Sequence, residues 1–290
     1  MKAFQVIGGL GSQMMAYAAY LKFKEQYKEL ILDYSDYRYN EAHNGEQLSK
    51  LFGIYGSELN YFWRTVWRSR NCFVKAFRKM LTGTHILKFV RPEKFNYDET
   101  VFNMRGNILF HQCWISPKYF EGFEEKIKNI YKFPEMTEEK NLEIAKKIRS
   151  TDSVCIHVRR GDYLKEPPLA GLAGLDFYAK ALKLIEEKIE NPTYFVFSDD
   201  MKWCKENLKL KNVEYVDWNK KENSFRDMQL MSICKHNIIP NSSFGWWGAW
   251  LNDNLNKIVI CPERWANPET GIELKDMVPE NEGWIKIKNY

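Results

Sequence analysis

KAFQVIGGLGSQ, residues 2–13, indicates the fold class of this chain. Its first half has the short apolar character of a buried strand, and the glycines that follow indicate a turn. An apolar-rich helix is expected over about 12–26, and ELILDY at 29–34 predicts a second strand. A strand, a glycine turn, a helix and another strand form a βαβ unit, whose two strands are parallel. The chain is therefore expected to be an α/β protein.

The rest of the first half predicts further helices and another strand. Residues 61–81 are expected to be helical, 107–114 to form a strand, and 117–131 to form a closing helix. Pro134 is the expected boundary, because the alternation of helices and strands restarts after it. The boundary predicts two domains, residues 1–133 and 134–290.

Helices and strands alternate more regularly beyond the boundary. Strands are expected at 153–158, 194–198, 213–216, 237–240 and 257–261. Helices are expected at about 138–149, 176–190, 224–235 and 246–251, with a further short one after 198. Thr137 is the expected cap of the first of these helices, and Ser224 with Asp227 resembles a capping box. We predict two Rossmann-like domains facing across a cleft, with the last few residues free to return to the first domain.

The composition favours a globular enzyme. Hydrophobic residues make up 44% of the 290 residues, enough for a sizeable core, and the net charge of +5 is too small for a nucleic-acid-binding protein. The start of the chain is too polar for a signal peptide, and no apolar run reaches the length of about 18 residues typical of a membrane span. Without a CxxC pair, the cysteines are expected to be buried, reduced thiols of a cytoplasmic protein: Cys72, Cys113, Cys155, Cys204, Cys234 and Cys261.

Charged side chains follow the predicted strand at 153–158. Arg159 and Arg160 come directly after it, and Asp162 lies two residues further on. Ligands bind beyond the carboxyl ends of parallel strands, and a guanidinium offers a planar fork of donors that matches phosphate oxygens. The pair therefore predicts a pyrophosphate site, with Asp162 fixing one arginine. A plain surface salt bridge is the alternative.

Two more strand ends carry polar side chains. Asp199 and Asp200, in VFSDD, could hold a divalent metal, bind a ribose or cap the next helix. In IIPNSSFGWWGAWL, residues 238–251, the Asn-Ser-Ser step opens a helix and suits a phosphate, whereas its tryptophans are expected in the core. The glycine turn at 8–13 matches neither the GxGxxG nor the P-loop spacing, which disfavours a nucleotide-dependent oxidoreductase.

Taken together, these segments resemble a known family. HVRRGDY at 157–163, FSDD at 197–200, DMQLMSICKHNIIPNSSFGWWGAWL at 227–251 and GGLGSQM at 8–14 are similar to the bacterial α-1,2-fucosyltransferases of glycosyltransferase family 11. The resemblance implies the GT-B arrangement of two Rossmann-like domains. It also implies that the C-terminal domain holds GDP-fucose, that no metal is needed, and that the first domain lies on the acceptor side.

The same resemblance implies roles for individual residues. Arg159 would bind the β-phosphate with support from Arg160, and Ser242 and Ser243 would bind phosphate oxygens. Asp227 would accept from the guanine N1 and N2 groups, and His157 would lie near the base. The predicted donor site is completed by Asp199, Asn241 and Phe244.

The N-terminal turn would face the fucose and the acceptor. Its residues on the acceptor side are Gly9, Gly11, Ser12 and Gln13. The family pattern is GGLGNQMF, so Ser12 stands where an asparagine is usual. This departure leaves open another linkage or acceptor, or a nucleotide-sugar-binding protein without catalysis.

The implied reaction is a direct displacement that inverts GDP-β-L-fucose to an α-fucoside. Fixed cations at the leaving diphosphate would stabilise the charge that develops there, which replaces a metal. The acceptor hydroxyl needs a general base at most, and Asp162 and Glu166 are both candidates. A metal-dependent transferase would use Asp199 and Asp200 instead.

The segment 61–94 combines cations with aromatic residues. It holds nine Lys or Arg and one Glu, and its apolar residues recur at helical spacing: Trp63, Val66, Trp67, Val74, Phe77 and Leu81. Such a helix either packs its apolar face on its own domain or lies in a membrane interface. The second alternative predicts peripheral contact of residues 61–81 with the inner face of the cell membrane, near a lipid-linked glycan acceptor.

Overall fold

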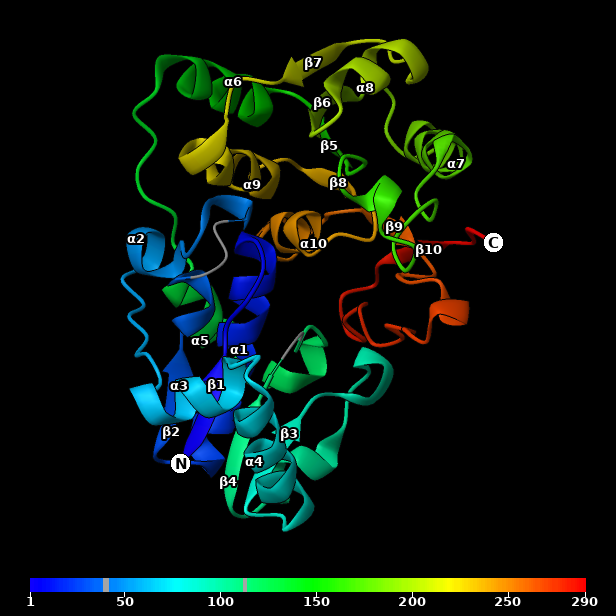
Figure 1. Cartoon of the computed structure of the whole chain (residues 1–290). Helices are drawn as coiled ribbons and strands as arrows, with labels where there is room; N and C mark the ends of the chain where they lie inside the picture. Colours follow the sequence, from blue (N-terminus) through cyan, green and yellow to red (C-terminus); the bar gives the residue numbers. More distant parts are fainter. Residues whose placement is uncertain (39–41, 112–113) are drawn as a thin grey trace. The chain divides into compact units, whose positions relative to one another are not determined.

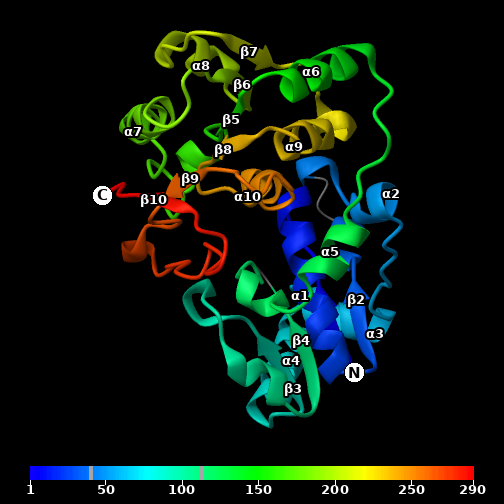
Figure 2. The ribbon, with the colours of Figure 1, turned by 180° about the vertical axis from the view of Figure 1, so that it is seen from behind.

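The structure is a computed structural model that describes the whole chain except residues 39–41 and 112–113. The chain divides into two compact units, Met1–Lys132 and Phe133–Tyr290. Each unit is built around its own parallel β-sheet (Figures 1 and 2). The expected domain boundary, between residues 133 and 134, lies beside this division.

The sheet of the first unit has the strand order β2-β1-β4-β3, and its strands are β1 (Lys2–Gln5), β2 (Leu30–Asp33), β3 (Leu87–Val90) and β4 (Asn107–Phe110). Helix α1 (Leu10–Gln26) joins β1 to β2, which run parallel, so the predicted βαβ unit is confirmed. Phe4 of β1 packs against Phe23 of α1 with ring centroids 5.1 Å apart. Its neighbour Ala3 faces the opposite side, toward Trp63, as the period of two along a strand requires.

The other helices of this unit are α2 (Leu48–Phe52), α3 (Tyr61–Arg68), α4 (Cys72–Gly83) and α5 (Glu124–Ile130). The prediction of one helix over 61–81 was wrong, because Asn71 begins a new helix: its side-chain oxygen accepts from the backbone N–H of Phe73 at 2.9 Å. The helix expected over 117–131 is likewise a 3₁₀ turn, Pro117–Phe120, followed by α5.

The second sheet has the order β10-β9-β8-β5-β6-β7 and is parallel throughout. Its strands are β5 (Ser153–Val158), β6 (Thr193–Ser198), β7 (Val213–Val216), β8 (His236–Ile238), β9 (Val259–Pro262) and β10 (Ile285–Ile287). The helices are α6 (Glu139–Ser150), α7 (Leu175–Glu186), α8 (Met201–Asn207), α9 (Phe225–Ser232) and α10 (Ser243–Trp250). Because β10 pairs with β9, the last residues stay with the second unit and do not return to the first.

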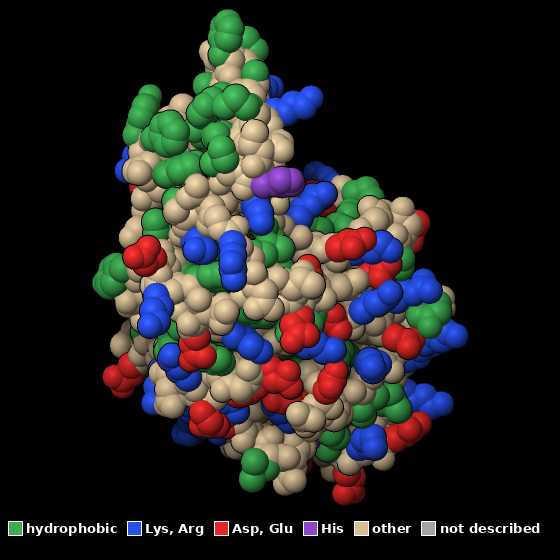
Figure 3. All heavy atoms as spheres, turned by 90° about the horizontal axis from the view of Figure 1, so that it is seen from below, with side chains coloured by type: hydrophobic (Ala, Val, Ile, Leu, Met, Phe, Trp, Pro, Cys, Tyr) green, Lys and Arg blue, Asp and Glu red, His purple; other side chains and the backbone are tan. Residues whose placement is uncertain are grey.

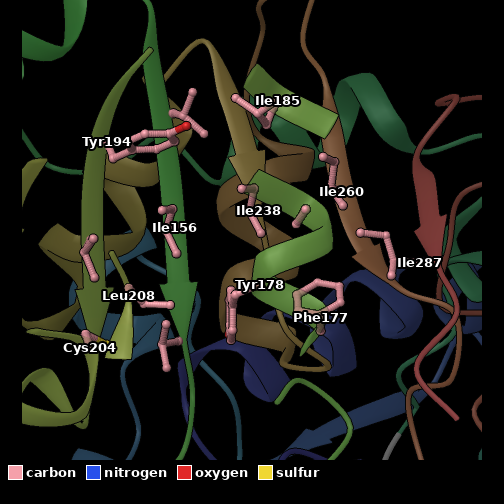
Figure 4. Close-up of a cluster of buried hydrophobic side chains, with 14 residues drawn as sticks. Ile156, Phe177, Tyr178, Ile185, Tyr194, Cys204, Leu208, Ile238, Ile260 and Ile287 are labelled. Atoms are coloured by element: carbon pink, nitrogen blue, oxygen red, sulfur yellow. The ribbon is translucent and has the colours of Figure 1, made fainter. Parts of the chain in front are cut away.

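Alternate residues of the central strand supply two cores. Ile156 of β5 packs with Ile238 of β8 and with Phe177 and Ile185 of α7 (Figure 4). Cys155, one residue earlier, belongs to the cluster formed with α6 and α9 on the other face. Helices therefore cover both faces, so the predicted α/β fold class is confirmed.

Two predicted helix caps were wrong. Glu138, not Thr137, precedes the first turn of α6, and its side chain makes no capping bond. Ser224 has helical backbone angles (φ −60°, ψ −23°), because a 3₁₀ turn at Lys221–Ser224 runs directly into α9. Without an extended residue at the start of α9, the capping box cannot form, and the Asp227 carboxylate is used elsewhere.

The cysteines are mostly buried, as expected. Cys155, Cys204, Cys234 and Cys261 are buried free thiols, and burial raises the pKa of Cys204 to about 11. Cys72 is an exception, because it starts α4 on the exposed face of that helix. Cys113 lies outside the described residues. In the part of the chain that the structure describes, no helix is both long and apolar enough to cross a bilayer.

Candidate functional site

The polar residues that follow β5, β6 and β8 gather at the carboxyl edge of the second sheet. Strands β8, β5 and β6 are neighbours and run parallel, with Ile156 opposite both Ile238 and Val196. The segments that leave these strands therefore emerge at the same edge, which is where ligands bind in open α/β sheets.

Arg159, the first residue after β5, is held by two carboxylates. Its Nη2 lies 2.8 Å from Oδ1 of Asp162, and its Nη1 lies 3.1 Å from Oδ2 of Asp199. Burial lowers the pKa of Arg159, but Asp199 and Asp162 outweigh it and raise that pKa overall. The guanidinium is thus a permanent cation in a fixed position. The predicted pairing with Asp162 is confirmed.

Arg160 is fixed in the same way from a different side. Its Nε lies 3.1 Å from Oδ2 of Asp200, and its guanidinium lies 4.2 Å from the ring centre of Trp203. Its backbone N–H donates to Oδ1 of Asp199 at 2.9 Å. Asp199 therefore binds two consecutive residues. One of its oxygens pairs with the Arg159 side chain, and the other accepts from the Arg160 backbone N–H.

The close approach of Asp199 explains why residue 161 is glycine. A Cβ atom at Gly161 would lie 2.8 Å from Oδ2 of Asp199, closer than ordinary packing allows. Glycine therefore lets the carboxylate reach the arginines.

The FSDD segment both caps a helix and contacts the arginines. Asp200 caps α8, because its Oδ1 accepts from the Trp203 N–H at 3.1 Å, and its other oxygen pairs with Arg160. Both aspartates thus contact arginines. Two guanidinium groups meet three carboxylates, a formal charge of −1. A guanidinium has five N–H donors, so the two contacts of Arg159 leave donors for a further anion.

His157 lies beneath the arginines, inside β5. Its side chain is buried, and within the described residues its Nδ1 has no hydrogen-bond partner. Burial and the charge of Arg159 lower the pKa of His157 to about 3, so the imidazole is neutral at physiological pH. A Cβ at Gly245 would fall 2.3 Å from this Nδ1, so glycine is required there for α10 to pack on the histidine.

The Asn-Ser-Ser step joins a loop contact to the start of a helix. The Asn241 amide donates to the backbone oxygens of Leu169 at 3.2 Å and Trp265 at 3.3 Å, so it anchors neighbouring loops. Ser242 is the buried N-cap residue of α10, and Ser243 is the first residue of that helix. The first backbone N–H groups of a helix have no intrahelical acceptor, which makes this terminus suited to an anion.

Aromatic residues of α10 support this terminus. The ring of Phe244 lies 5.7 Å from that of His157, measured between centroids. The tryptophans that follow are buried, as expected for core residues: Trp246, Trp247 and Trp250.

Asp227 lies on α9 with a neutral partner. Its Oδ1 accepts from Nδ2 of Asn219 at 2.8 Å, and Asn219 is bonded in turn to the buried Asn141. Burial raises the pKa of Asp227 to about 7, although Asn219 and Lys220 oppose this shift. Sequence reasoning missed Asn219 and Asn141, since neither belongs to a recognisable motif and they meet only in the fold.

Glu166 follows Asp162 by four residues. It follows the 3₁₀ turn Tyr163–Lys165, its side chain is exposed, and its backbone oxygen accepts from Leu169 at 2.8 Å and from Ala170 at 3.0 Å. Of the two predicted bases, Asp162 is therefore the one that contacts Arg159.

The N-terminal glycine turn belongs to the first unit. Gly9 is the N-cap residue of α1, whereas Gly11, Ser12 and Gln13 lie within the helix. Gly8 has φ +82°, a conformation that favours glycine.

Gln13 is buried and its amide is used within the protein. Its Nε2 donates to the backbone oxygens of Gly8 at 3.0 Å and Gly45 at 2.8 Å. Its Oε1 accepts from the Gln47 N–H at 2.9 Å. The side chain therefore ties the turn to the segment 45–47, a structural role that the sequence did not indicate.

The chain is similar to several known glycosyltransferases. A family described as Glycosyl transferase family 11 matches residues 74–288. An alpha-1,2-colitosyltransferase of Escherichia coli is 33% identical over 98% of this chain and 98% of that protein. A galactoside alpha-(1,2)-fucosyltransferase 1 of Homo sapiens is 34% identical over 34% of this chain and 28% of that protein. A crystal structure of NodZ alpha-1,6-fucosyltransferase soaked with GDP-fucose matches the fold with a TM-score of 0.50 at 15% identity, covering 86% of this chain and 91% of that one.

Proposed function

The chain belongs to glycosyl transferase family 11, and from this premise we propose that it is a galactoside α-1,2-fucosyltransferase. It transfers L-fucose from GDP-β-L-fucose to the 2-hydroxyl of a galactose in a glycan. The observation that carries the proposal is the arginine cluster at the carboxyl edge of the second sheet, where Asp162, Asp199 and Asp200 fix two guanidinium groups.

The second unit would bind the donor. Arg159 takes the β-phosphate with support from Arg160, and the first turn of α10, at Ser242 and Ser243, takes the remaining phosphate oxygens. A carboxylate at Asp227 suits guanine, which presents two adjacent donors at N1 and N2. His157 and Phe244 line the buried side of this site.

In the transfer step the bond between C1 of fucose and the β-phosphate oxygen breaks. The acceptor oxygen bonds to C1 from the opposite face, so the configuration inverts, and the hydroxyl proton leaves to a base or to water. The electron pair of the broken bond becomes negative charge on GDP. Arg159 stabilises that charge more strongly in the transition state than in the substrate, which accelerates the reaction.

The two predicted bases differ in their surroundings. Asp162 contacts Arg159 and therefore helps to position the cation. Glu166 follows the 3₁₀ turn Tyr163–Lys165 and, like Asp162, is exposed. Glu166→Gln should reduce kcat at constant donor affinity if Glu166 is the base, whereas Asp162→Asn should alter donor binding as well.

A second donor sugar is favoured by one comparison. The relative that is 33% identical over 98% of this chain is named for the transfer of colitose, a fucose that lacks its 3-hydroxyl. GDP-colitose is therefore the alternative donor. The two donors are separated by comparing kcat/KM for each with the same acceptor.

The acceptor side of the proposal rests on the first unit. The N-terminal turn at Gly9, Gly11 and Ser12 would bind the acceptor, and Gln13 would hold the turn in place. We propose that the acceptor is a lipid-linked glycan at the cytoplasmic face of the membrane.

The deciding experiment is product analysis with GDP-fucose and a lactose-type acceptor. We expect a 2-linked α-fucoside from the unaltered protein and almost none from Arg159→Ala. Binding of GDP-fucose without any product, with either donor sugar, would instead identify a nucleotide-sugar-binding protein.

A further inference from the structure

The outer face of α4 carries an apolar stripe that no part of the proposed reaction uses. Phe73, Phe77 and Met80 are 80%, 39% and 53% exposed. Positions i, i+4 and i+7 share one side of a helix, so the three side chains form a continuous row. Figures 1 and 2 place α4 in the lower part of the view, and Figure 3, seen from below, shows hydrophobic side chains gathered on this side with Lys and Arg next to them.

This row differs from the apolar face expected from the sequence. Trp63 and Trp67 pack inward with Ala3 and Leu109, so the tryptophans belong to the core of the first unit. The prediction that placed Phe77 on the same face as these tryptophans was wrong. The break before α4 explains the difference, because it changes the direction in which the later residues point.

Cations occupy the polar side of the same helix. Lys75 and Lys79 are exposed on α4, one turn apart, and Arg70 is exposed just before the helix. Two arginines of the preceding helix α3 are already paired: Arg64 lies 3.0 Å from Glu58, and Arg68 pairs with Asp36. The segment 61–94 contains a single Glu against nine Lys or Arg, so the segment that carries the row is strongly basic.

We propose that this face of α4 docks on an anionic lipid bilayer, with Phe73, Phe77 and Met80 inserted at the interface and Lys75 and Lys79 near the headgroups. Charge complementarity selects this occupant. Anionic headgroups would neutralise the net positive charge of the segment 61–94, whereas a second copy would bring an equally basic segment against it, which is unfavourable. The inference goes beyond the proposed function, because it concerns binding to a surface and is independent of the transfer reaction.

The experiment is sedimentation of the full chain with vesicles. We expect binding to vesicles of phosphatidylglycerol and phosphatidylcholine at low salt, little binding to pure phosphatidylcholine, and loss at high salt. Each lysine near an anionic surface contributes about fivefold to binding, so Lys75→Gln with Lys79→Gln should weaken it about 25-fold. Phe73→Ser, Phe77→Ser and Met80→Ser together should weaken it by about tenfold or more.

Matched controls replace exposed residues of the second unit. Leu142→Ser with Leu255→Ser, and Lys146→Gln with Lys188→Gln, should bind vesicles as the unaltered chain does. All variants should transfer sugar to a soluble acceptor at the unaltered rate, which shows that they are folded. If the unaltered chain bound vesicles but transferred no sugar, the proposed function would be wrong and the docking proposal would stand.

Two results would overturn the docking proposal. One is equal binding of the α4 variants and the controls to anionic vesicles. The other is a dimer of the unaltered chain that the Phe73, Phe77 and Met80 variant abolishes in sedimentation equilibrium, since a second copy would then cover the row.

Discussion

At the scale of single residues, the shape of the Arg159 side chain matters as much as its charge. The guanidinium is contacted by Asp162 and Asp199 on two different nitrogens. A lysine would keep the charge but has no fork, so it cannot hold both aspartates and a phosphate in this geometry. We expect Arg159→Ala to lower kcat by about 10²–10³-fold, as for the loss of one transition-state donor. Arg159→Lys should retain less than about a tenth of the activity.

Initial rates at saturating donor and acceptor test this expectation. Arg149→Lys, at an exposed position of α6, is the matched control and should leave the rate unchanged. An Arg159→Lys variant that retained most of the activity would show that charge alone is sufficient.

Asp199 is expected to act as a positioning residue for both arginines. Asp199→Asn keeps an acceptor for the Arg160 N–H but loses the ion pair with Arg159. Gly161→Ala should displace the same carboxylate, since the added methyl group would lie 2.8 Å from its oxygen. We expect each change to reduce kcat about tenfold or more, and the double variant to be no worse than the stronger single one. If the losses of kcat in the two single variants added up in the double variant, Gly161 would act independently of Asp199.

The carboxyl group of Asp227 predicts a pH dependence. Burial raises its pKa to about 7, so the folded protein keeps a proton that the unfolded chain loses near pH 4. The free energy of unfolding should therefore fall as pH rises from about 4 to 7. GDP needs the ionised form, so GDP affinity should rise about tenfold between pH 6 and pH 8.

Calorimetric titration with GDP at pH 6, 7 and 8 measures this effect. Asp227→Asn should bind GDP weakly with a flatter profile, because an amide cannot accept from both guanine donors. The same tenfold dependence in the variant would assign the titration to another group.

At the scale of elements, α10 packs closely on α9 because residue 248 is glycine. A Cβ at Gly248 would lie 2.7 Å from Cβ of Met231. Backbone-linked atoms cannot move aside easily, so Gly248→Ala should lower the free energy of unfolding by about 1–3 kcal/mol. Gly83→Ala, at the end of α4 with no atom within 4 Å of the added Cβ, is the control and should not destabilise the protein. Urea unfolding of both variants makes the comparison.

The sequence predicted the elements with a strong apolar pattern and missed those without one. All of the strands expected beyond Pro134 were found, because most are apolar runs such as β5. Strands β3 and β10 were missed: they have four and three residues, and each contains a lysine. The helix break at Asn71 was also missed, since the apolar spacing continues across it and only the capping bond reveals it. Helix boundaries depend on such local bonds more than on periodicity.

At the scale of the whole molecule, the sequence located the candidate site because parallel sheets place their ligands at one edge. Arg159, Asp199 and Ser242 are far apart in the chain, yet each follows a neighbouring strand of the sheet. What it did not predict are contacts that depend on the final packing, such as the bond from Asn219 to Asp227. The same applies to Gln13, whose partners Gly45 and Gln47 lie more than thirty residues away.

Binding of GDP should raise the thermal stability of the whole molecule. A ligand that binds only the folded state stabilises it by about 2.7 kcal/mol at a hundredfold excess over Kd. GDP should therefore raise the Tm by about 5–10 °C, and it should do so in EDTA, because two arginines and the α10 terminus are proposed to carry the diphosphate. ADP is the matched control, since it has the same diphosphate but lacks the paired N1 and N2 donors that Asp227 would bind. An equal shift with ADP would remove Asp227 from base recognition, and a GDP shift abolished by EDTA would show that a metal holds the diphosphate.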